Sequence, residues 1–119
     1  MNAREKDKIF LDHILQSIQR IQDYVEGVTK EEFFEDLQLQ DAVIRRLEVI
    51  GEAARQLSAD LKAKHRNIPW AQVIGMRNVL IHEYFGVDLG LIWATVQKDL
   101  PILREAILEI LKVEDADQT

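Results

Sequence analysis

The chain has 119 residues, of which 47% are hydrophobic and 30% are charged, and its formal net charge is −6. This length suits one domain built around one hydrophobic core, and the composition excludes an intrinsically disordered chain. The acidic balance excludes a protein that coats nucleic acid over its whole surface, although it leaves room for a small basic site.

The sequence also limits the cellular setting and the available chemistry. No apolar run approaches the roughly 20 residues that span a bilayer, and the charged first ten residues hold no signal-peptide core. We therefore expect a cytoplasmic protein without membrane contact. The chain has no cysteine, which excludes disulfides and thiolate chemistry. No metal-ligand spacing and no glycine-rich phosphate loop is found, so neither a metal nor a nucleotide cofactor is expected.

Helical periodicity begins near the N-terminus, and no alternating pattern of useful strand length is found. The first helix is predicted from about Arg4 to Glu26, with Gly27 as its end. Thr29 is then predicted to cap a short helix that carries two phenylalanines and Leu37.

A second long helix is predicted over about 39–61, because apolar residues recur there at every third or fourth position. The basic stretch at 61–70 breaks this pattern. Asn67 and Pro69 mark it as a loop, in which His65 is expected to be solvated, whereas His13 is expected to pack near the first helix's apolar stripe.

The third helix is predicted over 70–84, with Gly86 as its cap. Asp88 is predicted to cap a fourth helix through Lys98, and Pro101 to kink or restart it. The last apolar stripe starts at Ile102 or Leu103, and 114–119 reads as a frayed acidic tail. The elements together predict one all-α domain over 1–119, an antiparallel bundle of four or five helices.

Arg77 lies within the apolar stripe of the third helix, one turn after Val73. A buried guanidinium without a partner would be very costly, so Arg77 should face a cleft, an anion or a partner chain. Alternatively, its stem covers apolar surface while its head pairs with a carboxylate such as Glu83. His82 follows five residues later, about 140° around an ideal helix. The two side chains meet only if the helix end distorts or if two copies of the chain share the site.

The segment RNVLIHEY resembles the signature of HEPN domains, in which an arginine and a polar residue precede a histidine. More narrowly it is similar to the R-x4-H-x-Y form of HepT toxins, the partners of MntA nucleotidyltransferase antitoxins. Arg77, Asn78 and His82 match the HEPN positions, and Tyr84 matches the additional tyrosine of HepT. The segments RRLEVIGEAA, IPW and KDLPIL are also typical of this family, so the resemblance covers most of the chain.

This resemblance implies a HEPN-like homodimer with a composite active site and a toxin of a type II toxin–antitoxin system. The implied activity is metal-independent endonucleolytic cleavage of tRNA or mRNA. His82 would move protons and Arg77 would stabilise charge on phosphorus, with Asn78 orienting the phosphate or the imidazole. An MntA-like antitoxin would transfer AMP to Tyr84, and the added charge and bulk would block RNA.

Two other readings remain open at this point. The chain could be a non-catalytic helical subunit of a nucleotidyltransferase complex, with Arg77 and His82 binding a nucleotide. It could also be a plain dimeric interaction module in which Arg77 forms a structural ion pair. Only the toxin reading predicts that this chain alone arrests growth.

Overall fold

The structure is a computed structural model that describes the backbone of residues 1–82 and 88–116 and the side chains of 1–76 and 88–115. Helix α1 spans Ala3–Val25. The side chain of Asn2 caps it by accepting a hydrogen bond from the Glu5 N–H at 2.9 Å. Gly27, which adopts a φ of +74°, ends it as predicted, because residues with a Cβ rarely adopt that backbone conformation.

Helix α2 spans Lys30–Glu35, and the predicted cap at Thr29 is confirmed. The Thr29 hydroxyl accepts from the Glu32 N–H and donates to the Glu32 carboxylate, each at 3.1 Å. This short helix places Phe33 in the core with no exposed surface, and its ring lies 5.3 Å from that of Trp93. Leu37, predicted on the same helix, instead begins the next one.

The second long helix is shorter than predicted, because α3 spans Leu37–Arg55 and a separate α4 spans Ala59–Lys64. Ser58 caps α4 by accepting from the Leu61 N–H at 3.2 Å. Asp7 of α1 accepts in turn from the Ser58 N–H and hydroxyl, at 2.8 and 2.6 Å. The basic stretch predicted as a loop is therefore helical up to Lys64.

Helix α5 spans Trp70–His82 and starts directly after Pro69. Helix α6 spans Leu89–Ala94, and its predicted cap is confirmed, because Asp88 accepts from the Leu91 N–H at 3.1 Å. A π turn, η1, follows at Thr95–Asp99, and α7 continues over Leu100–Ala116.

The predicted kink or restart at Pro101 takes the form of this π turn, which lies just before the proline, and the α-helix resumes at Leu100. The Leu100 N–H donates to the Thr95 carbonyl, five residues back. In a regular helix the proline ring would clash with the carbonyl four residues earlier, and the wider turn relieves that conflict. Helix α6, η1 and α7 thus follow one another without a loop.

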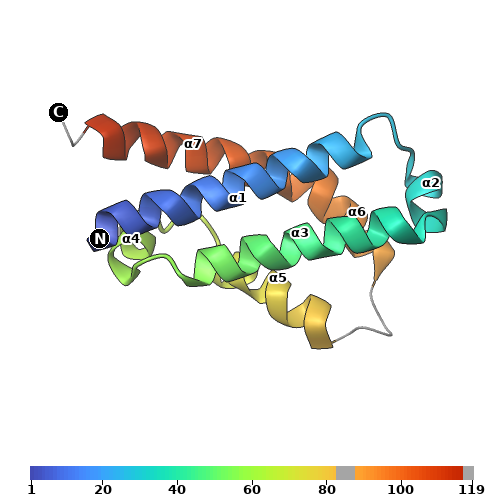
Figure 1. The fold of residues 1–119 in the computed structure, drawn as a ribbon, viewed down its shortest axis with the longest axis horizontal. Helices are drawn as coiled ribbons and strands as arrows, with labels where there is room; N and C mark the ends of the chain where they lie inside the picture. Colours follow the sequence, from blue (N-terminus) through green and yellow to red (C-terminus); the bar gives the residue numbers. More distant parts are fainter. Residues whose placement is uncertain (83–87, 117–119) are drawn as a thin grey trace.

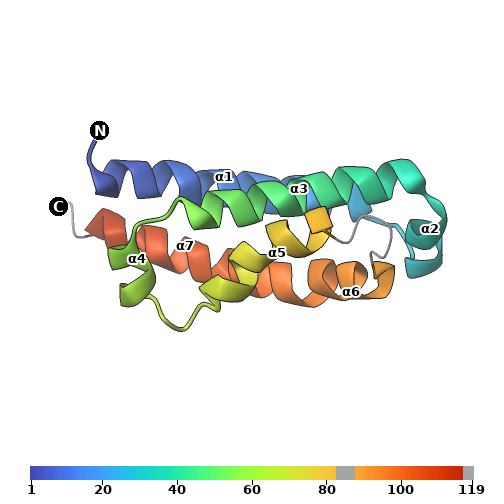
Figure 2. The same ribbon diagram turned by 90° about the horizontal axis from the view of Figure 1, so that it is seen from below.

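The long helices form an antiparallel bundle of 49 × 29 × 24 Å, as Figure 1 shows. Helices α1 and α3 lie side by side, α7 packs along α1, and α5 packs on the other side of α3 (Figures 1 and 2). No strand occurs in residues 1–82 and 88–116, so the all-α prediction is confirmed. The fully buried large hydrophobic side chains come from α1, α2, α3 and α7: Leu11, Ile14, Ile18, Ile21, Phe33, Val43, Leu47, Ile50, Leu100 and Ile107.

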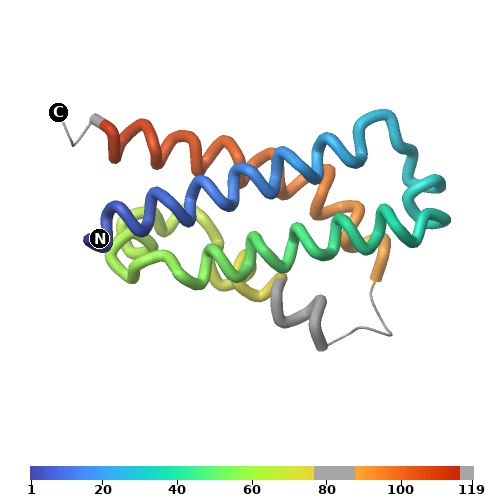
Figure 3. The backbone as a smooth tube through the Cα atoms, viewed as in Figure 1, coloured from blue at the N-terminus to red at the C-terminus, as the bar shows by residue number. Residues whose placement is uncertain are grey.

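The predicted frayed tail is wrong for 114–116, which belong to α7. Glu114 is only 7% exposed. Its backbone carbonyl accepts from the Arg4 guanidinium at 2.9 Å, and its carboxylate lies 3.3 Å from the Lys64 ammonium. The cluster joins the first turn of α1, α4 and the end of α7, which lie together in the tube view of Figure 3. Residues 117–119 lie outside the described part.

Candidate functional site

The start of α5 is held firmly against the bundle. Trp70 is 8% exposed, and its indole N–H donates to the His65 carbonyl at 3.0 Å. Val73, one turn later, is 4% exposed. Both contacts belong to the N-terminal half of α5, so the motif residues that follow extend from a fixed helix.

The structure places the backbone of Arg77, Asn78 and His82 on α5, and their side chains lie outside the described residues. Tyr84 and the predicted cap at Gly86 also lie outside them. The α-helix is continuous from Trp70 to His82, so no break separates Arg77 from His82. Their Cα positions are therefore about 140° apart around the helix axis, as the sequence spacing predicts.

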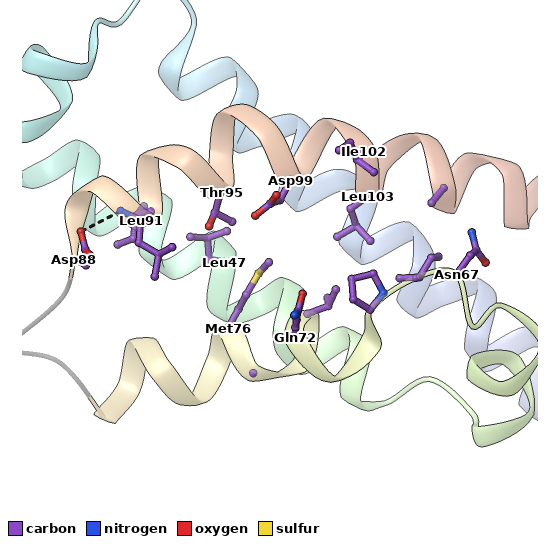
Figure 4. Close-up of a pocket in the computed structure, with 16 residues that line it drawn as sticks. Leu47, Asn67, Gln72, Met76, Asp88, Leu91, Thr95, Asp99, Ile102 and Leu103 are labelled. Atoms are coloured by element: carbon purple, nitrogen blue, oxygen red, sulfur yellow. Dashed lines mark hydrogen bonds between the residues drawn. The ribbon is translucent and has the colours of Figure 1, made fainter.

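A groove of about 720 Å³ lies between the N-terminal half of α5 and the α6–η1–α7 segment. Its α5 wall includes Gln72, Val73 and Met76, and its floor includes Leu47 of α3. In Figure 4, Met76 and Gln72 extend from α5 toward Thr95, Asp99 and Leu103 on the facing wall. This groove directly adjoins α5, the helix that carries the motif.

The sequence did not reveal this groove, because its lining comes from five separate helical elements and from the loop before α5. The sequence held one indication of it: Ile102 and Leu103 are adjacent apolar residues, and only one of them can occupy the first core position of the last helix. The structure assigns the core position to Leu103, which is 6% exposed, and leaves Ile102 70% exposed on the groove. Leu91 of α6 is a second exposed aliphatic on the same groove, at 59%.

One of the two remaining histidines differs from its prediction. His65 is not solvated: its side chain is 16% exposed and its Nε2 lies 3.9 Å from the Glu114 carboxylate. His13 is exposed, and its ring packs edge-on against Phe10 of the predicted apolar stripe, at 5.6 Å between centroids. Neither histidine belongs to a metal site in the described residues, which contain no group of three His, Cys, Asp or Glu side chains that could hold a metal ion.

Within the described residues, no helix combines the length and the apolar character needed to cross a membrane.

Comparison with known proteins identifies the family. The family described as Ribonuclease HepT-like matches residues 14–110, a stretch that includes the whole motif. A Caldanaerobacter subterraneus protein named "Putative RNase" is 43% identical, covering 88% of this chain and 94% of that protein. A Thermococcus cleftensis protein named "Probable ribonuclease HepT" is 41% identical, covering 85% of this chain and 92% of its own length.

A longer relative shares the same domain. A Methanocaldococcus jannaschii protein named "Gamma-glutamylcyclotransferase and putative RNase" is 48% identical over 97% of this chain, which spans only 52% of that protein. No solved structure gives a significant match. The match to the family over most of the chain, the helical bundle and the motif on α5 agree: this chain belongs to the HepT-like family of HEPN ribonucleases.

Proposed function

We propose that this chain is the toxin of a toxin–antitoxin pair, a metal-independent endoribonuclease that cleaves tRNA or mRNA in the cytoplasm. One observation carries the proposal: the arginine–asparagine–histidine motif lies on the continuous helix α5, inside the stretch that matches the ribonuclease family. Relatives that share 41–43% identity carry ribonuclease names.

The proposed active site is shared by two copies of the chain. A continuous α5 keeps Arg77 and His82 about 140° apart around the helix axis, which disfavours a site built from both residues of one helix. A two-fold axis near the C-terminal half of α5 would bring the arginine of one copy toward the histidine of the other. The homodimer is thus part of the proposal.

The proposed chemistry needs no metal. His82 takes the proton from the RNA 2′-hydroxyl or gives one to the leaving 5′-oxygen, because imidazole changes charge near neutral pH. The 2′-oxygen forms a bond to phosphorus as the bond to the 5′-oxygen breaks. Arg77 stabilises the negative charge that develops on the phosphoryl oxygens, and Asn78 orients the phosphate or the imidazole.

The proposed control is covalent. A nucleotidyltransferase partner transfers AMP from ATP to the Tyr84 phenol, so that the phenolic oxygen bonds to the α-phosphorus and pyrophosphate leaves. The added phosphate brings negative charge and bulk within two residues of His82, which would repel and block an RNA backbone.

The test is cleavage of labelled tRNA and mRNA by the purified chain in excess EDTA. We expect cleavage by the wild type and losses of at least 100-fold for His82→Ala and Arg77→Ala. His13→Ala is the matched control, since His13 is exposed on α1 and should not change the rate. Full activity of His82→Ala, or cleavage only after divalent metal is added, would refute the proposed mechanism.

A further inference from the structure

The groove beside α5 has the chemistry of a docking site for another protein. We propose that it binds an amphipathic helix of a protein partner, one whose apolar stripe is flanked by lysine or arginine residues. The inference does not depend on the proposed ribonuclease activity, because binding to the groove can be measured without RNA.

The apolar part of the argument comes from the two exposed aliphatic side chains. Leu91 is 59% exposed on α6, and Ile102 is 70% exposed on α7, and both line the groove. The other residues that line the groove are also mostly apolar and include Val73, Met76 and Leu103. Large aliphatic groups that gather around a concavity are typical of protein interaction sites, because covering them removes apolar surface from water.

The spacing of these two residues fits a helix. Eleven residues separate Leu91 from Ile102 on a nearly continuous helical segment, which corresponds to about 16 Å or three turns. A partner helix that presents apolar residues at positions i, i+4, i+7 and i+11 covers the same length. A helix also satisfies its own backbone hydrogen bonds, and the described groove walls contain no strand edge with which an extended peptide could pair.

The charged residues that line the groove indicate the sign of charge expected on the partner helix. Among the described lining residues the charged ones are Asp88 and Asp99, and no lysine, arginine or histidine is present. Asp88 is engaged as the cap of α6, while the Asp99 carboxylate makes no hydrogen bond or ion pair with the described side chains. Figure 4 shows the Asp99 carboxylate turned toward the groove. An RNA backbone would be repelled here, and a basic helix attracted.

The same charges disfavour a second copy of this chain as the occupant. A two-fold interface across the groove would bring Asp88 and Asp99 of both copies into one surface, and like charges in an interface cost affinity. The proposed dimer involves the C-terminal half of α5, and the groove adjoins the N-terminal half. A bound partner helix would contact Met76, the residue directly before Arg77, and so would lie against the helix that carries the motif.

The test is fluorescence anisotropy with two synthetic helical peptides and the full chain. Both peptides present leucine at i, i+4, i+7 and i+11; one carries lysine on the flanking positions and the other carries glutamate. We expect the lysine peptide to bind at least tenfold more tightly than the glutamate peptide. Leu91→Asn and Ile102→Asn should each weaken its binding about tenfold, since each removes one apolar contact. Val113→Asn is the matched control, because Val113 is exposed on α7 away from the groove.

Charge-reversal variants distinguish binding in the groove from non-specific attraction of a basic peptide to this acidic chain. Asp99→Lys should weaken binding of the lysine peptide at least tenfold and strengthen binding of the glutamate peptide. The control is Glu109→Lys, at an exposed α7 position outside the groove, which should change the affinity of either peptide less than threefold. Equal effects of the two reversals, or equal binding by Ile102→Asn and Val113→Asn, would overturn the proposal. So would light scattering that shows Ile102→Asn to dissociate a dimer, which would make the groove an interface between copies. All these positions are exposed, and melting curves should therefore match the wild type.

Discussion

The contact between Asp7 and Ser58 should account for a large part of the stability of the bundle. Asp7 of α1 is 7% exposed. Its two carboxylate oxygens accept from the Ser58 N–H and hydroxyl at 2.8 and 2.6 Å, which fixes the start of α4 against α1. Asp7→Ala removes two hydrogen bonds to a charged acceptor and leaves a backbone N–H without its partner. We expect the free energy of unfolding to fall by about 2–4 kcal/mol.

The assay is urea denaturation followed by far-ultraviolet circular dichroism. The midpoint should fall while the slope stays constant, because the change removes contacts without altering the surface exposed on unfolding. Asp12→Ala is the matched control: Asp12 is exposed on the same helix, and its carboxylate accepts from the Gln16 side chain at 2.6 Å. The control should cost less than about 0.5 kcal/mol.

A double-mutant cycle with Ser58→Ala tests the assignment to this pair. Ser58→Ala removes both the hydroxyl that donates to Asp7 and the cap of α4. The two substitutions together should cost at least about 1 kcal/mol less than their sum, since they remove one shared contact. Strict additivity, or a loss in Asp7→Ala no larger than that of Asp12→Ala, would refute the reasoning.

Three further outcomes are expected. Gly27→Ala should lower stability by about 1 kcal/mol in thermal melts, because a Cβ there meets no atom within 4 Å and only the positive φ is strained. Glu114→Gln keeps the side-chain shape but removes the charge beside Arg4 and Lys64, both partly exposed; we expect a loss of roughly 1 kcal/mol that shrinks in 1 M salt. Tyr84→Phe should keep most of the RNA cleavage yet escape the antitoxin. Mass spectrometry after incubation with partner and ATP should show one AMP on the wild type and none on the variant, and labelling of both would remove the covalent switch.

The structural features that could be predicted from the sequence are those stabilised by contacts between residues close together in the chain. The caps at Thr29 and Asp88 were predictable because each side chain bonds to an N–H only three residues away. The break between α3 and α4 was not. Leu57 and Leu61 keep the apolar spacing of α3 and are buried, so the pattern looks continuous. The partner that stabilises the break is Asp7, which lies 51 residues away in the sequence.

The acidic C-terminal residues show the same limit. A run of acids at the end of a chain usually lies in solvent, which led to the prediction of a frayed tail. Glu114 is buried instead, because Arg4 and Lys64 approach it from 110 and 50 residues away. Their charges could be read from the sequence, but their positions could not.

The candidate site likewise has a part that could be predicted from the sequence and a part that could not. Arg77 and His82 could be selected from the sequence, because their spacing and their place in an apolar helix are local properties. The groove could not, since α3, α5, α6 and α7 meet there only in the folded chain. The π turn before Pro101 also contributes, and the proline alone gave no sign of whether the helix would stop, kink or widen.

The cluster around Glu114 also determines where additional domains could be attached. It brings the first turn of α1 against the last turns of α7, so the described ends of the chain emerge together, beside α4 (Figure 1). A second domain fused to either terminus would therefore extend the long axis of the bundle. It would leave α2, α6 and the C-terminal end of α5 uncovered. The bundle is thus suited to modular fusion, and the Methanocaldococcus relative, about twice as long as the segment it shares with this chain, is consistent with that architecture.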